Sequence, residues 1–301
     1  MRHGDSDPSL RTMESTDFRL EHPGEAGRVV RGRVTRPVFD DGHNAAVIVV
    51  HGFKGFFNWG FFPALQRAIA AQGFACIAIN LSGSGVGDDL ETFSDDEAFF
   101  RSTPSRDLED LERLRTAVEA GEHDALGGIE ANRLALFGHS RGGGSVLLHA
   151  EQRGDYRAVV TWASVARSSR FTDDQVHAWR AAGVLEVPNA RTGQVHRMSV
   201  DFLDDVERNA DALDVLAACQ RSRTPTLLVH GEQDESVPFE EGLEIFEAFT
   251  PGRADLVAIE GAGHTFGAVH PYAGITPALE QAMKRTVDFL TKHLRDEHGR
   301  G

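Results

Sequence analysis

The pentapeptide Gly138-His139-Ser140-Arg141-Gly142 follows directly after an apolar run at residues 134–137. A serine between two glycines at the end of such a run is typical of a sharp strand-to-helix turn, because glycine fits where a side chain would collide with the backbone. The turn lifts the hydroxyl of Ser140 clear of the sheet, so we interpret Ser140 as a nucleophile that attacks a carbonyl carbon. The pattern arises by chance in about one chain of this length in ten, so the surrounding sequence has to support the interpretation.

Apolar segments recur on both sides of this turn, and segments with helical periodicity separate them. The apolar segments are residues 45–50, 74–79, 134–137, 158–162, 225–229 and 256–259. The helical patterns are residues 62–72, 105–119, 142–152, 240–249 and 276–293. Unbroken apolar runs suit strands covered on both faces, and their alternation with helices predicts a parallel sheet with right-handed crossovers. Residues 18–20 and 29–34 predict an antiparallel hairpin at the sheet edge.

One long segment interrupts this alternation. Residues 164–223 separate two predicted strands and contain helical patterns at residues 173–182, 200–208 and 210–220. A plain crossover needs far fewer residues, so we interpret the segment as a helical cap over the carboxyl ends of the strands, where open α/β sheets bind ligands. A peripheral excursion that only adds stability is the alternative. We expect one catalytic domain at residues 17–294, with flexible ends at residues 1–16 and 296–301.

Two later loops supply an acid and a base for Ser140. The loop after the predicted strand 225–229 holds Asp234, our candidate for the acid that orients the base, with Glu232 and Glu235 as rivals. The loop after the predicted strand 256–259 holds His264 among glycines. A histidine on a short loop just beyond a strand end can reach the serine, so His264 is our candidate for the general base.

The oxyanion formed by attack on a carbonyl needs two fixed hydrogen-bond donors. Arg141, directly after the nucleophile, predicts one backbone N–H at the start of a helix, where the helix dipole also favours negative charge. Phe53, in the glycine-flanked stretch after the strand 45–50, predicts the other. Phe56, Phe57 and Trp59 follow it, and either line a substrate pocket or anchor the next helix.

Two further sequence features give only weak indications of the chemistry of the site. The Arg141 side chain either binds a substrate carboxylate or is solvated at the helix start. Residues 82–87 are rich in glycine and serine but lack the lysine of a phosphate-binding loop and the spacing of a dinucleotide fingerprint, so we interpret them as a flexible loop.

The composition limits the function classes. The 301 residues include 46 acidic and 31 basic side chains, and the formal charge of −15 repels nucleic acid and anionic membranes. Cys76 and Cys219 are far apart without metal-ligand spacing, which indicates buried thiols. We expect no metal and no cofactor. No leader or membrane-spanning pattern occurs, so a cytoplasmic protein with a small-molecule acyl substrate is expected, and its oligomeric state is not predicted.

With these motifs the chain resembles the α/β-hydrolase superfamily over about residues 17–294, and within it the dienelactone-hydrolase-like and prolyl-oligopeptidase-like serine esterases. The order Ser140, Asp234, His264 is typical of this superfamily and differs from the chymotrypsin and subtilisin orders. The resemblance implies an eight-stranded, mostly parallel sheet flanked by helices, with its second strand antiparallel and a cap after the sixth strand. Dienelactone hydrolases use a cysteine nucleophile, and Ser140 departs from them.

The motifs together predict a serine hydrolase that cleaves a carboxylic ester or thioester through an acyl-enzyme intermediate. A small-peptide or amide hydrolase of aminopeptidase-like activity is the alternative, because the same catalytic groups cleave amides. A non-catalytic binding protein of the same fold is a third hypothesis, which the presence of all three candidate side chains disfavours.

Overall fold

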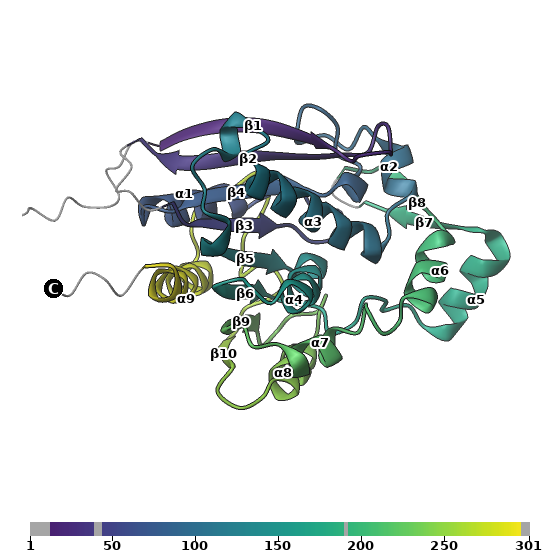
Figure 1. The fold of residues 1–301 in the computed structure, drawn as a ribbon. Coiled ribbons are helices and arrows are strands. Elements are labelled where there is room, and N and C mark those ends of the chain that lie inside the picture. Colours follow the sequence, from purple (N-terminus) through teal and green to yellow (C-terminus); the bar gives the residue numbers. More distant parts are fainter. Residues whose placement is uncertain (1–12, 39–43, 190–191, 296–301) are drawn as a thin grey trace, which may run out of the picture.

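The computed structural model describes residues 13–38, 44–189 and 192–295. Eight strands form one sheet in the order β1-β2-β4-β3-β5-β6-β9-β10 (Figure 1). Their bounds are β1 Met13–Glu21, β2 Val29–Pro37, β3 Ala46–Val50, β4 Ala75–Asn80, β5 Leu134–His139, β6 Ala158–Trp162, β9 Thr226–Gly231 and β10 Ala254–Ile259. β2 pairs antiparallel with both neighbours, and the remaining pairs are parallel. The expected sheet, with its antiparallel second strand, is confirmed.

Helices cover both faces of the sheet. Their bounds are α1 Phe62–Ala71, α2 Asp96–Phe100, α3 Pro104–Ala120, α4 Arg141–Arg153, α5 Asp173–Ala182, α6 Asp201–Arg208, α7 Val215–Arg221, α8 Phe239–Ala248 and α9 Pro277–Leu294. One apolar cluster joins alternate strand residues such as Ile48 and Leu136 to α3, α4, α7 and α8. A second joins the intervening residues, such as Val49, to α1 and α9. The central strands are buried on both sides for this reason, as the unbroken apolar runs predict.

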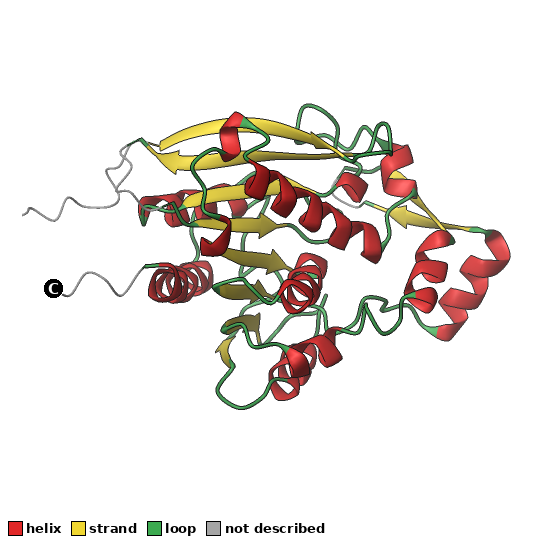
Figure 2. Cartoon of the chain, in the orientation of Figure 1, coloured by secondary structure: helices red, strands yellow, loops and turns green. Residues whose placement is uncertain are grey.

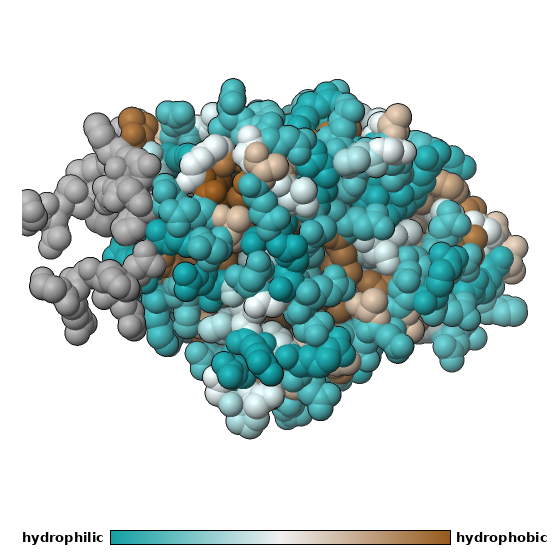
Figure 3. Space-filling view, in the orientation of Figure 1, coloured by the Kyte–Doolittle hydropathy of each residue, from teal (hydrophilic) through white to brown (hydrophobic). Residues whose placement is uncertain are grey.

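The long insertion lies between β6 and β9, after the sixth strand. The arrowheads of the parallel strands point toward the end of the molecule where α5 and α6 project (Figure 2). A side-chain capping box between Thr172 and Gln175 starts α5. On the face shown in Figure 3 the surface is mostly hydrophilic, and hydrophobic side chains show between the body and these cap helices.

The insertion contains the expected helices, but it differs from the expected helical cap in two details. The cap contains an antiparallel hairpin of β7 Val184–Pro188 and β8 Val195–Ser199, whose short strands carry too few alternating residues to stand out in the sequence. The third helix, α7, packs on α4 and α8 and so belongs to the body. The cap has its own apolar cluster, in which Phe99 of the unexpected helix α2 joins Trp179, Met198 and Phe202.

The start of the chain also differs from expectation. Residues 13–16, expected to be flexible, form the first half of β1, where Thr16 pairs with Val34. Residues 1–12 and 296–301 lie outside the described residues. Cys76 and Cys219 are buried free thiols, and burial raises the pKa of both. Within the described residues, no helix combines the length and the apolar character needed to cross a bilayer.

Candidate active site

Ser140 occupies the turn between β5 and α4. Its backbone has φ +57° and ψ −122°, a conformation that L-residues rarely adopt. The Ser140 N–H donates to the Trp162 carbonyl at 2.9 Å, and the Ser140 carbonyl accepts from Gly143 N–H at 2.9 Å. These bonds hold the strained turn at the carboxyl end of the sheet.

The flanking glycines are required by close backbone approach. A Cβ on Gly138 would collide with the carbonyl of Gly142, and a Cβ on Gly142 would collide with the carbonyl of His51. We call the serine turn at residues 138–142 the elbow. It can form only because its glycines let α4 pack directly against the preceding strands. The sequence signal of two glycines around a serine has this physical basis.

Asp234 and His264 meet above neighbouring strands. The His264 Nδ1–H donates to Asp234 Oδ2 at 2.8 Å, which leaves Nε2 as the acceptor of the ring. Asp234 Oδ1 accepts from the N–H groups of Ser236 and Val237 at 2.8 and 2.9 Å. The carboxyl is buried, whereas the rival acids Glu232 and Glu235 are exposed.

A second histidine supports the same carboxylate. His230 Nε2 lies 3.5 Å from Asp234 Oδ2 and donates to the Val237 carbonyl at 2.8 Å. Burial alone would raise the pKa of Asp234, but its hydrogen bonds with His230, His264 and Val237 together hold that pKa well below its usual range. Sequence reasoning missed His230, whose only signal is its place at the end of β9.

Ser140 and His264 line one cavity of about 460 Å³, a size suited to a small organic ligand. The ring of His139, the residue before Ser140, lies 4.7 Å from the His264 ring, centroid to centroid. His139 Nε2 also donates to the His264 carbonyl at 3.0 Å. The loop that carries the candidate base is thus anchored to the turn that carries the candidate nucleophile.

The loop after β3 lies against the elbow. A Cβ on Gly52 would lie 2.9 Å from Ser140 Cβ, so the backbone leading into Phe53 passes directly beside the candidate nucleophile. Burial lowers the pKa of His51 to about 4, so its ring is neutral at neutral pH. His51 Nδ1–H donates to the Gly52 carbonyl at 2.8 Å, which fixes the loop. Phe53 and Arg141 line the cavity together with Ser140.

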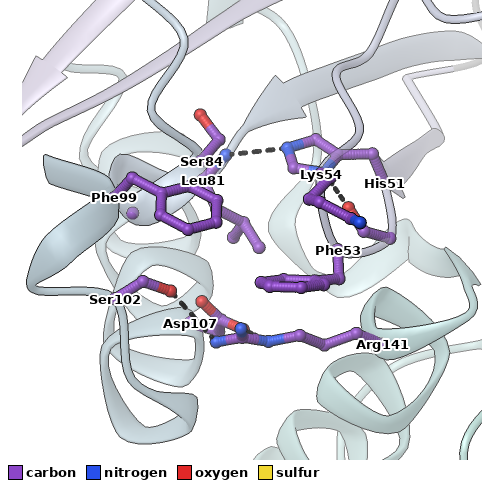
Figure 4. A pocket seen from close by; sticks show the side chains of 11 residues that line it. His51, Phe53, Lys54, Leu81, Ser84, Phe99, Ser102, Asp107 and Arg141 are labelled. Atoms are coloured by element: carbon purple, nitrogen blue, oxygen red, sulfur yellow. Dashed lines mark hydrogen bonds and ion pairs between the residues drawn. The ribbon is translucent and has the colours of Figure 1, made fainter. Parts of the chain in front are cut away.

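The Arg141 side chain is largely buried and ion-paired, which differs from the expectation of a solvated arginine at the helix start. Its Nε donates to Asp107 Oδ2 at 2.8 Å, and its guanidinium lies over the ring of Phe53 at 5.7 Å (Figure 4). It also lies over the ring of Phe202, at 5.5 Å. Burial raises the pKa of Asp107 to about 6, while the positive charge of Arg141 opposes this rise. Arg141 is therefore held in a fixed orientation, with part of its side chain facing the cavity.

The structure places Phe56, Phe57 and Trp59 elsewhere than the expected pocket. All three are buried in the apolar cluster under α1 and α9, and the Phe57 N–H donates to Asn80 Oδ1 at 2.9 Å. They share this cluster with Phe61 and Phe62 at the start of α1, which matches the alternative that they anchor the next helix. The apolar lining of the cavity comes instead from Phe53, Val165, Phe171, Met198, Phe202 and Val237.

The loop of residues 82–87 is not a free loop. Ser82 to Ser84 form a buried turn, and Asp110 accepts hydrogen bonds from the Ser82 N–H and hydroxyl at 2.6 and 2.9 Å. In the part of the chain that the structure describes, no group of three or more His, Cys, Asp or Glu side chains is arranged to hold a metal ion.

The sheet order, the serine turn and the insertion after the sixth strand define the α/β-hydrolase fold. A solved structure, Est1E from Butyrivibrio proteoclasticus with bound ferulic acid, shares this fold with a TM-score of 0.68 at 19% identity, covering 92% of this chain and 99% of that one. A match to a family model also identifies the family of this chain within the fold. The model of the prolyl oligopeptidase family matches residues 59–297, and the chain belongs to that family.

The chain is similar to two curated proteins over only part of the length of each. The chain is 28% identical over 200 residues to the acylamino-acid-releasing enzyme of Mus musculus, covering 63% of this chain and 24% of that enzyme. It is 24% identical over 260 residues to the uncharacterized peptidase YuxL of Bacillus subtilis (strain 168), covering 84% of this chain and 36% of that protein. The chain thus spans well under half of either relative.

Proposed function

We propose that this protein is a serine hydrolase that cleaves carboxylic esters or thioesters through an acyl-enzyme. The observation that carries the proposal is the bond of 2.8 Å between His264 Nδ1 and the buried carboxylate of Asp234, beside the cavity that Ser140 lines. Because the Nδ1–H of His264 donates a hydrogen bond to Asp234, Nε2 carries no proton and is available to take the hydroxyl proton of Ser140.

The chemistry proceeds in two acyl transfers. Ser140 Oγ attacks the carbonyl carbon as its proton passes to His264 Nε2, and the backbone N–H groups of Phe53 and Arg141 donate to the resulting oxyanion. His264 then gives the proton to the leaving alcohol or thiol as the ester bond breaks. A water molecule then loses a proton to His264 and attacks the acyl carbon. As the bond between the acyl group and Ser140 Oγ breaks, His264 returns that proton to Oγ and the acid is released. Asp234 stays ionised throughout, as its depressed pKa supports.

Amide cleavage is the second candidate. The family match and the similarity to an acylamino-acid-releasing enzyme support activity on small peptides or acylated amino acids. An amide leaving group needs protonation before it departs, so the same groups serve, but the amine must lie beside His264. A panel of p-nitrophenyl acyl esters and acylated amino-acid p-nitroanilides separates the candidates by their kcat/KM values.

Replacement of the candidate nucleophile tests the proposal. Ser140→Ala abolishes both ester turnover and covalent labelling by a fluorophosphonate. Ser15→Ala is the matched control, because Ser15 lies on β1, far along the sheet from Ser140, and its hydroxyl lies 3.1 Å from Thr35 Oγ1. Labelling of the Ser140→Ala protein at the wild-type level would show that another residue is the nucleophile.

A further inference from the structure

The described side chains that line the cavity beside Ser140 include basic residues and no acidic ones, although the chain as a whole is acidic. The chain has 46 acidic and 31 basic residues, yet among the described residues that line this cavity none is acidic. Four are basic: Lys54, Arg141, Arg167 and Arg170. A cavity with one sign of charge and apolar walls concentrates ligands of the opposite sign.

Two of these arginines, Arg167 and Arg170, form ion pairs with glutamates of α8. Arg170 Nη2 lies 2.8 Å from Glu241 Oε1, and the other oxygen of Glu241 accepts the Ala166 N–H at 2.8 Å. Arg167 Nη2 lies 2.7 Å from Glu244 Oε2. Glu241 and Glu244 are one turn apart on α8, and neither lines the cavity.

This arrangement leaves donors for a ligand. A guanidinium carries five N–H groups in a planar fork, and one contact with a glutamate uses only part of that fork. Both arginines are among the residues that line the cavity, whereas the glutamates paired with them are not. Arg141 follows the same plan, because its partner Asp107 also does not line this cavity.

Apolar side chains complete the wall. Phe171 and Phe202 lie edge to face at 5.9 Å between ring centroids, and Met198 packs in the same cluster. A ligand that fits both parts of the wall has an apolar body and an anionic end. The fork geometry of arginine suits a planar carboxylate, which it binds with two parallel hydrogen bonds.

Building on the proposed function, we infer that the substrate is an ester that carries a carboxylate, bound by Arg167 and Arg170 on the segment after β6. These two residues select the substrate and take no part in bond breaking. Because both side chains are partly exposed, added salt weakens the selection.

Two pairs of esters test this inference. The first pair is the mono-p-nitrophenyl ester of adipic acid and the same ester with a carboxamide in place of the free carboxylate. The second pair is the acetate ester of meta-hydroxybenzoic acid and that of meta-hydroxybenzamide. The selectivity is the ratio of kcat/KM for the anionic ester to kcat/KM for its neutral partner. The pairs place the carboxylate on the acyl side and on the leaving-group side, respectively.

In at least one pair, the double variant Arg167→Met/Arg170→Met lowers the selectivity by about tenfold or more, the loss expected for hydrogen bonds to a charged group. Intrinsic ester reactivity cancels in this comparison of two proteins. Arg221→Met is the matched control, since Arg221 is an exposed arginine paired with Glu151 on the body, away from the cavity lining, and it retains the wild-type selectivity.

The outcomes separate the inference from the proposed function. Hydrolysis of both esters with equal selectivity in the wild type and the double variant, in both pairs, overturns the inference and leaves the hydrolase assignment intact. Absence of hydrolysis together with absence of fluorophosphonate labelling overturns the hydrolase assignment itself. If the double variant does not fold, the salt dependence of the wild-type selectivity decides: a ratio that does not fall with added sodium chloride in either pair contradicts the role of the arginines.

Discussion

His264 Nδ1 and Asp234 Oδ2 lie 2.8 Å apart, although the two residues come from loops that follow different strands, β9 and β10. These strands are parallel neighbours, in which Ala258 pairs with His230 and Ile259 with Gly231, so their carboxyl ends place the two loops side by side. The pairing register therefore brings the two loops within hydrogen-bond distance. The hydrogen bond holds the imidazole with Nε2 directed away from Asp234.

Asp234→Asn tests this relationship. The NH2 group of the new asparagine can donate to Nδ1 of His264, which favours the tautomer with its proton on Nε2. That tautomer cannot take the proton of Ser140, so kcat for a p-nitrophenyl ester falls by about a thousandfold to ten-thousandfold. Steady-state kinetics measure the change. Glu235→Gln, at an exposed neighbouring acid, keeps the wild-type rate. A loss below about tenfold in Asp234→Asn would show that the acid does not orient the base.

Asp107→Asn changes how stability depends on pH. Burial raises the pKa of Asp107 to about 6 in the folded protein, above its usual value near 3.8. Between these two values the folded protein retains a proton that the unfolded chain has lost, so rising pH destabilises the fold in this window. The free energy of unfolding of the wild type therefore falls relative to that of Asp107→Asn as pH rises from about 4 to about 6, by at most about 3 kcal/mol.

Urea unfolding of both proteins across this pH range measures the effect. The difference between the two curves reports the titration of Asp107 together with its charge coupling to the nearby Asp110, because the two proteins share all other titrating groups. Parallel curves would mean that Asp107 has a similar pKa in the folded and unfolded chains.

Gly142→Ala destabilises the fold through the serine turn. Its new Cβ would collide with the carbonyl of His51, so α4 must move away from β3, at a cost of about 2 kcal/mol or more. Gly144→Ala is the matched control two residues along the same helix, where the Cβ would lie 3.0 Å from the end of the Val165 side chain. Urea unfolding compares the two, and an equal loss in both would contradict the special role of Gly142.

Phe202→Ala loosens the cap. Phe202 is buried and stacks on Trp179 at 5.6 Å between ring centroids, and its loss removes a side chain that also packs against the guanidinium of Arg141. We expect a loss of about 3–5 kcal/mol in the local stability of the cap and a rise in KM for esters. Limited proteolysis within residues 171–208 measures the loosening. Phe246→Ala, at an exposed position on α8, leaves the cleavage rate unchanged; equal cleavage of both variants would contradict a cap held by this cluster.

Much of the fold could be predicted from local pattern. The apolar runs that become β3 to β6 are buried on both faces, and a strand buried on both faces has no polar positions, so its sequence shows it directly. The helix α5 was expected at residues 173–182 and occupies Asp173–Ala182, because its capping residue and periodicity are both local. The β7–β8 hairpin was missed, since its strands are only five residues long and it packs against α2, a contact with a distant part of the chain.

The candidate site could likewise be predicted only in part from the sequence. The positions of Ser140, Asp234 and His264 beyond strand ends could be predicted, while their roles in catalysis stay a prediction. The aromatic residues after β3 could not be divided from the sequence, because Phe53 and Phe57 have the same chemistry and differ only in which side of the loop they face. His230 and Asp107 became visible only when the fold brought them to Asp234 and Arg141.

The sequence by itself determined the alternation of strands and helices and the glycine-flanked serine turn, because backbone sterics and hydrophobic periodicity act over a few neighbouring residues. Only the tertiary structure decided which distant groups meet: the arginines that line the cavity, the glutamates of α8 that hold them, and the buried partners of Asp234 and Arg141. Those contacts depend on how the crossover connections bring distant segments together in space, and a pattern of a few neighbouring residues does not specify which distant side chains then meet.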